Sequence, residues 1–248
     1  MNFLLYDIEG GDFLGNVIAV GSVVLPRLYF KVPYVKKCKA GDSKCAKESA
    51  LAAIPLFAAG IPEVGVMTLD PVTVKKTDAS SPNLKLIVSD YIITGLKNCI
   101  PKKVKYDPEQ SKIFLKMECS GQLEGNYEMK GQLLILPIEG KGPVHVTLNK
   151  ADFSIVLDIV EIEKNGIKYW DIKEWNYGYE LIGKSKVVFE NLFNGNKALA
   201  QAAKEVIEES GNEIIKEVGS PILNDFIKIL VDSLKSFFHS VPISELAE

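Results

Sequence analysis

Residues 196–237, NKALAQAAKEVIEESGNEIIKEVGSPILNDFIKILVDSLKSF, carry the pattern that decides the fold. Apolar side chains recur there every three or four residues, which places them on one stripe of a helix. Gly219-Ser220-Pro221 interrupts the pattern, so we expect a kink at that point. The pattern spans about 40 residues, long for one globular helix, and an extended structure has to cover it. The stripe comprises Leu199, Ala203, Val206, Ile207, Ile214, Ile215 and Val218, then Ile222, Phe226, Ile229, Leu230, Leu234 and Phe237.

The chain before this helix, residues 64–189, alternates between apolar and polar residues with the period of β-strands. Turn-forming residues separate the strands, so hairpin follows hairpin and the sheet is antiparallel. The predicted turns are Ser81-Pro82-Asn83, Asp107-Pro108, Gly140-Lys141-Gly142-Pro143 and Lys164-Asn165-Gly166. The predicted strands are Leu84–Thr94, Val104–Tyr106, Lys112–Cys119, Tyr127–Pro137, Val144–Leu148, Phe153–Glu163, Tyr169–Tyr179 and Lys186–Phe189.

Together these elements predict an α+β fold in which a strongly curved antiparallel sheet wraps one long kinked C-terminal helix. A short helix over Ala46–Ala59, which contains Pro55, precedes the sheet. Side chains have difficulty filling such an elongated interior, so we expect an apolar tunnel along it. The alternative is an ordinary filled core, in which the alanines of residues 198–203 serve only helix propensity.

Composition excludes several classes of protein. The chain has 248 residues, 47% hydrophobic and 25% charged, with a net charge of −3, which is the balance of a globular protein without a nucleic-acid-binding surface. His145 and His239 are far apart and not at ligand spacing, and neither has an acid partner recognisable in the sequence, so no metal site or catalytic triad is expected. No Gly-x-Ser-x-Gly motif occurs, and Gly140-x-Gly142 is followed by a proline instead of a helix. We therefore expect no enzyme and no cofactor.

The four cysteines give different expectations. Cys38 and Cys45 are seven residues apart around Gly41-Asp42-Ser43, whose turn can bring the sulfurs together, which favours a disulfide over two reduced thiols. Such a bond implies an oxidising compartment. Cys99 and Cys119 flank a predicted hairpin, and a continuous two-residue period points them to opposite faces. We therefore expect two free thiols there, although a bulge near Pro101 would permit a second disulfide.

Residues 1–30 form an apolar N-terminal segment ahead of a single domain at residues 31–248. Phe13–Pro26 has the length of the apolar region of a signal peptide, and Ala19 and Gly21 fit a cleavage site. The preceding residues carry Asp7, Glu9 and Asp12 but no basic residue, which is the wrong charge for a signal peptide. The cysteine spacing still favours a secreted, extracellular protein.

Motifs in the right order along the chain resemble the insect takeout proteins and their relatives, the juvenile-hormone-binding proteins. The similarity runs from about Cys38 to Leu246, and Asn191–Asn196 is its most specific piece. The other motifs are the paired cysteines Cys38 and Cys45, Ala59–Glu63, Leu69–Pro71, Gly95–Lys97, Gly131–Pro137 and Val241–Leu246. The resemblance implies the tubular lipid-binding fold, a continuous tunnel for terpenoids, acyl compounds or quinones, and a Cys38–Cys45 disulfide. The acidic N-terminus and the extra Cys99 and Cys119 depart from the family pattern.

We therefore expect a secreted carrier, monomeric and without stable membrane insertion, that encloses one elongated hydrophobic molecule. Two alternatives stay open: a lipid-transfer protein that docks on membranes through Phe237, Phe238 and Val241, and a protein-interaction module whose cavity has collapsed. The residues expected to line the tunnel are Phe57, Tyr91, Ile93, Leu115, Leu133, Ile135, Phe153, Ile155, Trp175, Tyr177, Phe189, Phe193, Ile215 and Phe226. Ordinary core is the competing interpretation for each of them, because a one-residue shift in strand register reverses the faces.

Overall fold

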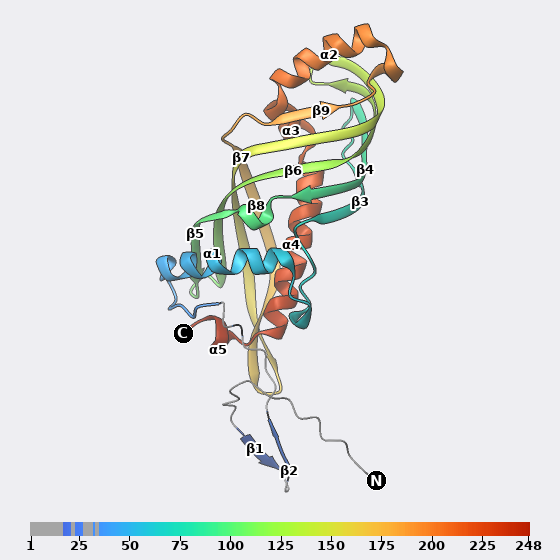
Figure 1. Ribbon diagram of the computed structural model, residues 1–248. Coiled ribbons are helices and arrows are strands. Elements are labelled where there is room, and N and C mark those ends of the chain that lie inside the picture. The colour runs from blue at the N-terminus through green and yellow to red at the C-terminus, as the bar shows by residue number, and fades with distance from the viewer. Residues whose placement is uncertain (1–16, 21–22, 27–31, 33–34) are drawn as a thin grey trace, which may run out of the picture.

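The C-terminal helices run through a curled sheet that covers most of their length (Figure 1). The structure is a computed structural model that describes residues 17–20, 23–26, 32 and 35–248. Its C-terminal helices are α2 (Lys197–Glu209), α3 (Gly211–Val218) and α4 (Ser220–Ser240). In Figure 1 α4 runs along the sheet, whereas α2 lies across one end of it.

The predicted single helix is thus divided into three. The break before α4 falls at Gly219, where the sequence predicts it. The break between α2 and α3 was not predicted, and it has a packing cause. A β-carbon on Gly211 would lie 2.2 Å from the carbonyl oxygen of Ser185. Only glycine therefore permits the start of α3 to approach the backbone at Ser185 so closely.

Seven antiparallel strands form one sheet with the order β3-β4-β6-β7-β8, in which β5 also pairs with β6 and β9 with β7. The predicted α+β class is confirmed, and the antiparallel sheet is curved as expected. The strands are β3 (Val72–Asp78), β4 (Leu84–Thr94), β5 (Ile100–Asp107), β6 (Lys112–Leu133), β7 (Leu136–Lys164), β8 (Ile167–Leu181) and β9 (Lys186–Phe189).

The predicted turn at Gly140–Pro143 is wrong, because these residues lie inside β7. A β-carbon on Gly140 would meet the Tyr127 hydroxyl at 2.7 Å, and one on Gly142 would meet the carbonyl oxygen of Glu190 at 2.8 Å. The two glycines therefore make room for neighbouring segments and do not reverse the chain. The reversal between β6 and β7 occurs instead at Leu134 and Ile135, so two pairs of predicted strands merge into two long ones.

The predicted N-terminal helix is α1 (Ser43–Ala59), which begins three residues earlier than expected because Asp42 caps it. The backbone N–H of Cys45 donates to the Asp42 carboxylate at 3.0 Å. Pro55 lies inside this helix without ending it. The remaining short elements are β1 (Val17–Val20), β2 (Val23–Pro26), η1 (Pro62–Val64), η2 (Leu96–Asn98), η3 (Phe193–Gly195) and α5 (Ile243–Leu246).

The expected leader segment lies mostly outside the described residues. Within it, β1 and β2 pair as an antiparallel hairpin. The signal-peptide expectation and the division at residue 30 therefore remain predictions.

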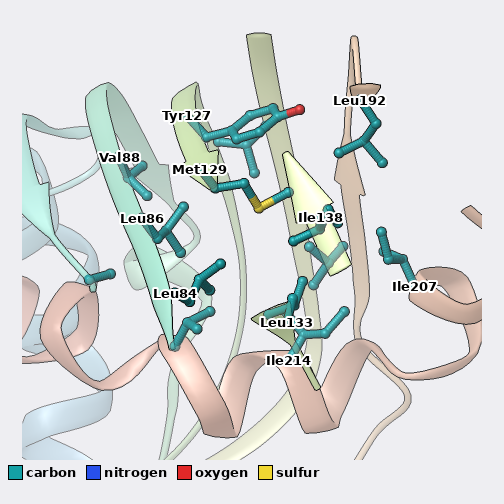
Figure 2. Close-up of a cluster of buried hydrophobic side chains, with 14 of the residues drawn as sticks. Leu84, Leu86, Val88, Tyr127, Met129, Leu133, Ile138, Leu192, Ile207 and Ile214 are labelled. Carbon is teal, nitrogen blue, oxygen red and sulfur yellow. The ribbon is translucent and has the colours of Figure 1, made fainter. Parts of the chain in front are cut away.

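Buried side chains form two clusters along the molecule. The aliphatic core packs β4, β6 and β7 against α2 and α3, and Figure 2 shows Leu86, Met129, Ile138 and other members pointing from the sheet toward Ile214. The aromatic core surrounds α4 and the chain's C-terminal end, and its buried rings are Trp170, Phe237 and Phe238.

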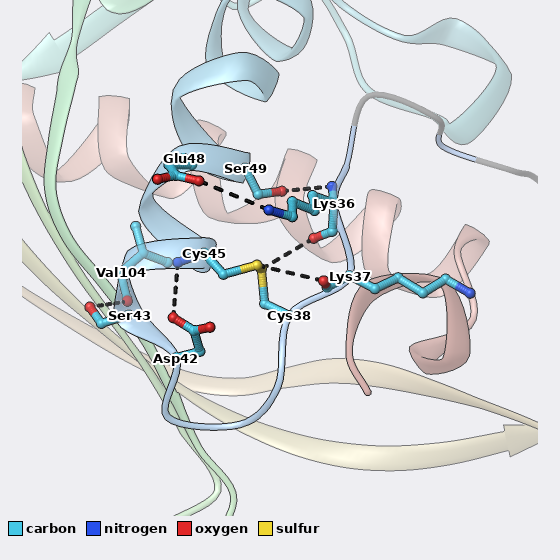
Figure 3. Close-up of a disulfide and its surroundings, with 9 residues drawn as sticks. All are labelled: Lys36, Lys37, Cys38, Asp42, Ser43, Cys45, Glu48, Ser49 and Val104. Carbon is cyan, nitrogen blue, oxygen red and sulfur yellow. Dashed lines mark hydrogen bonds and ion pairs between the residues drawn. A yellow bond between two sulfur atoms is a disulfide. The ribbon is translucent and has the colours of Figure 1, made fainter.

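Both pairs of cysteines are disulfides. Cys38–Cys45 is confirmed, with Cα atoms 5.7 Å apart, and Figure 3 shows the sulfurs joined beside the capped start of α1. The Ser43 hydroxyl donates to the carbonyl oxygen of Val104 at 2.7 Å, which attaches this loop to β5.

The prediction of free thiols at Cys99 and Cys119 is wrong, because they form a disulfide with Cα atoms 4.4 Å apart. The two-residue period is broken on both strands, by register shifts between Pro101 and Lys103 and between Cys119 and Gly121. Cys99 itself ends η2 and lies outside the strand. These irregularities turn both side chains to the same side of the sheet.

Candidate ligand-binding cavity

A cavity of about 190 Å³ lies between the aliphatic and the aromatic core. Sheet residues contribute at every second position, as Val144, Val146 and Leu148 do on β7, because alternate side chains face the interior. Helix residues contribute every three or four positions, as Ile222, Phe226 and Leu230 do on α4. The full lining is Leu86, Val88, Ile93, Thr94, Gly95, Leu96, Cys99, Met117, Cys119, Ser120, Gly121, Gln122, Leu123, Val144, Val146, Leu148, Phe153, Ile155, Val187, Phe189, Ile214, Ile215, Val218, Gly219, Ile222, Leu223, Phe226, Ile227 and Leu230.

The wall of this cavity is almost entirely carbon. Among the described residues that line it, the only polar side chains are those of Thr94, Ser120 and Gln122, and none is charged. The two cysteines in the wall are bonded to each other and supply no thiol. A site of this kind binds by removing apolar ligand surface from water, and it offers neither a nucleophile with a base nor a set of metal ligands.

Six of the residues predicted to line the interior contact this cavity: Ile93, Phe153, Ile155, Phe189, Ile215 and Phe226. They come from β4, β7, β9, α3 and α4, so the fold brings together residues more than one hundred positions apart. Whether they bind a ligand remains a prediction.

The other predicted residues lie elsewhere. Tyr91 and Leu133 are buried within the aliphatic core, and Phe193 packs against it. Phe57, Leu115, Trp175 and Tyr177 pack against the aromatic core. Ile135 is 81% exposed at the turn between β6 and β7, which places it outside any interior site. The prediction for Ile135 was wrong because the sequence pattern placed the turn at Gly140–Pro143, whereas the chain reverses at Ile135 itself.

Several lining residues were missed. Leu223, Ile227 and Leu230 flank Phe226 on α4, and the helical spacing of the stripe could have identified them. Met117 and Cys119 share a face of β6 with Leu115, so the two-residue period could have identified them. Cys99 was hidden because it lies outside its strand beside the register shift between Pro101 and Lys103, for which the sequence carries no clear signal.

Hydrogen-bonded polar side chains connect the sheet to α4 in the interior. The buried Thr77 hydroxyl lies 2.7 Å from the Tyr91 hydroxyl and donates to the Asp225 carboxylate at 2.5 Å, which links β3 and β4 to α4. Burial raises the pKa of Tyr91. Desolvation likewise raises the pKa of Tyr127 to about 12, while its hydroxyl donates to the carbonyl oxygen of Glu190 at 2.7 Å. Both tyrosines are therefore neutral hydrogen-bonding groups over the physiological pH range.

Within the part of the chain that the structure describes, no helix is both long and apolar enough to cross a bilayer.

The crystal structure of Takeout 1 from Epiphyas postvittana superimposes with a TM-score of 0.83 at 26% identity, over 86% of this chain and 100% of that one. Two sequence relatives are the circadian clock-controlled proteins daywake. The Drosophila yakuba protein is 26% identical over 227 residues, which is 85% of this chain and 86% of the relative. The Drosophila melanogaster protein is 25% identical over 228 residues, 86% of this chain and 87% of the relative.

These matches confirm the resemblance to the takeout proteins that the motifs indicate. The family model described as haemolymph juvenile hormone binding protein (JHBP) matches residues 16–248, which includes every strand and helix that forms the cavity. The chain therefore belongs to the haemolymph juvenile hormone binding protein family.

Proposed function

We propose that this protein is a secreted, monomeric carrier that encloses one elongated hydrophobic molecule, such as a terpenoid, a fatty-acyl compound or a quinone, and that it catalyses no reaction. The observation that carries the proposal is the uncharged, carbon-lined cavity between the sheet and α3 and α4. Membership of a family described by hormone binding supports the same function. Two disulfides support secretion, because such bonds persist in oxidising compartments.

Burial alone supplies enough free energy for useful affinity. Enclosing about 400 Å² of apolar ligand surface contributes on the order of 10 kcal/mol at roughly 25 cal/mol per Å², before the costs of association. Micromolar or tighter binding is therefore accessible without a charged partner in the cavity.

The test is native mass spectrometry of the protein secreted by a host with an oxidising secretory pathway, followed by denaturing extraction. We expect one bound compound of a few hundred daltons on each chain, which identifies the ligand class. Protein that leaves the host empty is then incubated with long-chain fluorescent probes. An empty protein that takes up none of them contradicts the carrier function and favours an interaction module with a collapsed cavity.

The side chains proposed for membrane docking are buried. Phe237, Phe238 and Val241 are 5%, 7% and 0% exposed, because α4 and the chain after it pack these side chains into the aromatic core. They are therefore unavailable to a bilayer in this conformation. Liposome flotation tests the point directly, since a carrier remains in the soluble fraction.

A further inference from the structure

A second hollow lies outside the cavity, between the outer edge of β9 and α2. It encloses about 470 Å³, and Leu192, Ala200 and Ile207 form its apolar part. Unlike the cavity, this groove carries the charged side chains of Lys197, Lys204 and Glu208 from α2.

The groove and the cavity share one wall. Val187 and Phe189 of β9 line both hollows, so these two residues form a partition between them. Phe189 is only partly buried, and its ring packs against Tyr127 with centroids 4.8 Å apart. The cavity alone is smaller than the range of roughly 300–1,000 Å³ of ligand sites, whereas the two hollows together, about 660 Å³, lie within it.

Strand β9 also presents unused backbone donors to the groove. Glu190 N–H donates inward to the carbonyl oxygen of Pro143 on β7, and Ser185 N–H donates to the Asn212 side chain on α3. Since N–H groups alternate between the two edges of a strand, those of Val187 and Phe189 point the same way as that of Ser185, away from β7. Neither N–H donates a hydrogen bond to any other part of the described chain.

The charges on α2 are unevenly matched. Lys204 lies 3.7 Å from Glu208, one helical turn further on. Lys197 has no carboxylate within 4.0 Å among the residues that the structure describes, although it lines the same groove. The groove therefore offers one uncompensated ammonium group and two free N–H donors next to an uncharged, mostly apolar cavity.

We propose that the cavity and the groove are two compartments of one ligand site, which open into each other when Phe189 moves, and that the ligand is a long-chain carboxylate. The apolar chain occupies the cavity, and the carboxylate head lies in the groove beside Lys197, where the N–H groups of Val187 and Phe189 donate to its oxygens. Displacement of Phe189 from Tyr127 is offset by apolar contact with the ligand chain. This inference rests on the proposed carrier function and narrows its ligand class.

The first test compares a long-chain fatty acid with its methyl ester, using isothermal titration at low salt. We expect the acid to bind about tenfold more tightly, because charge-assisted hydrogen bonds are stronger than neutral ones. Lys197→Gln removes most of that preference, because it weakens binding of the acid more than binding of the ester. Lys216→Gln, an exposed lysine of α3 outside both hollows, serves as the matched control and keeps the preference.

The outcomes separate this inference from the carrier function. If acid and ester bind equally and Lys197→Gln changes neither, the carboxylate proposal is overturned while the carrier function stands. If neither compound binds, both fail together.

A second test concerns the partition itself. Ala200→Phe fills the groove from α2, and Ala198→Phe places the same ring on the exposed side of that helix. We expect Ala200→Phe to weaken long-chain acids about tenfold, because it fills the compartment of the carboxylate head, and to spare a small uncharged apolar probe that the cavity holds alone. Ala198→Phe leaves both unchanged. Equal weakening of the acid and the uncharged probe by Ala200→Phe, or no effect on either, overturns the two-compartment site.

Discussion

The two halves of the interior meet at the cavity but are held together differently. In the aromatic core, Trp170 packs against Tyr106 and Phe238 with ring centroids 4.8 and 5.5 Å apart, and Phe237 packs against Phe57 at 5.7 Å. Flat, rigid rings in such pairs fill space well and stabilise each other beyond the area they bury.

Polar contacts also stabilise the half of the molecule that contains the aromatic core. Asp171 on β8 accepts from the His239 ring at 2.7 Å and pairs with the Lys235 ammonium group at 3.1 Å, which ties the end of α4 to the sheet. The aliphatic half has a looser boundary. There the sheet ends in the four-residue strand β9, and the helices are interrupted at Ser210 and Gly219. From this difference we expect the aromatic half to contribute more to the stability of the fold than the aliphatic half.

We expect the largest loss of stability from a substitution in the aromatic core. Trp170→Ala should lower the free energy of unfolding by about 3–5 kcal/mol, because it leaves a cavity among packed rings. Urea denaturation of both variants measures this against Tyr169→Ala, the adjacent partly buried residue whose ring lies under the Lys164 ammonium group. The control should lose less than about 1 kcal/mol. A loss of similar size in the two variants would contradict the special role of the aromatic core.

The two disulfides give the next effect. In the chain-entropy account, replacing Cys99 and Cys119 by alanine lowers stability by about 3 kcal/mol, and replacing Cys38 and Cys45 by about 2 kcal/mol, since they close segments of 20 and 7 residues. Because only the first pair lines the cavity, only its loss should also weaken binding of an apolar probe. Denaturation and probe titration on both double variants test the distinction. Equal effects on binding would argue against it.

A change within the cavity should separate binding from stability. Val146→Phe places a ring in the open space, so we expect probe affinity to fall about tenfold while the free energy of unfolding changes by less than about 1.5 kcal/mol. Thr147→Phe is the matched control, since the next residue of β7 faces away from the cavity and should leave binding intact. Titration and urea denaturation provide the two readouts. Unchanged affinity for Val146→Phe would mean that ligands bind elsewhere.

The smallest effect concerns the attachment of β9. The imidazole of His145 on β7 bonds to Glu124 of β6 and lies 3.1 Å from the carboxylate of Glu190, which follows β9. The hydrogen bond with Glu124 is the main cause that raises the pKa of His145 above its ordinary value of 6.5. The contribution of protonated His145 to stability is therefore fully present below pH 6.5, and it is lost as the pH rises through the raised pKa of His145 in the folded protein.

Melting temperatures measured across this interval test the contact. The native protein should lose a small increment of stability as the pH rises above 6.5, and His145→Gln should abolish that dependence. His239→Gln, at the aromatic end, is the control for the loss of a histidine. A pH dependence that survives in His145→Gln would exclude this residue as its source.

Much of the fold followed from local pattern. The bounds of β4 and β9 were predicted to the residue, because each strand is a short alternating run between turn residues. The merging of strands into β6 and β7 was missed, since Gly140 and Gly142 look like a turn in sequence and their close neighbours, Tyr127 and Glu190, are known only from the fold.

The cavity was harder to predict than the sheet. The face assignment failed at Cys99, because this residue lies outside its strand and a register shift between Pro101 and Lys103 breaks the alternation that the prediction assumed. Ile135 failed because a turn shifted by a few residues moves a side chain from the interior to solvent. Residues on regular helical spacing, such as Ile215 and Phe226, were placed correctly in the wall.

The sequence by itself determined the class of this protein: its helical stripe, its alternating strands, the Cys38–Cys45 bond and the takeout motifs are all local patterns that few residues encode. The tertiary structure alone decided where the chain leaves open space, which cysteines meet across bulged strands, and which side chains divide the cavity from the groove. These features depend on the relative positions of segments far apart in the chain, and small irregularities of register and close backbone contacts set those positions.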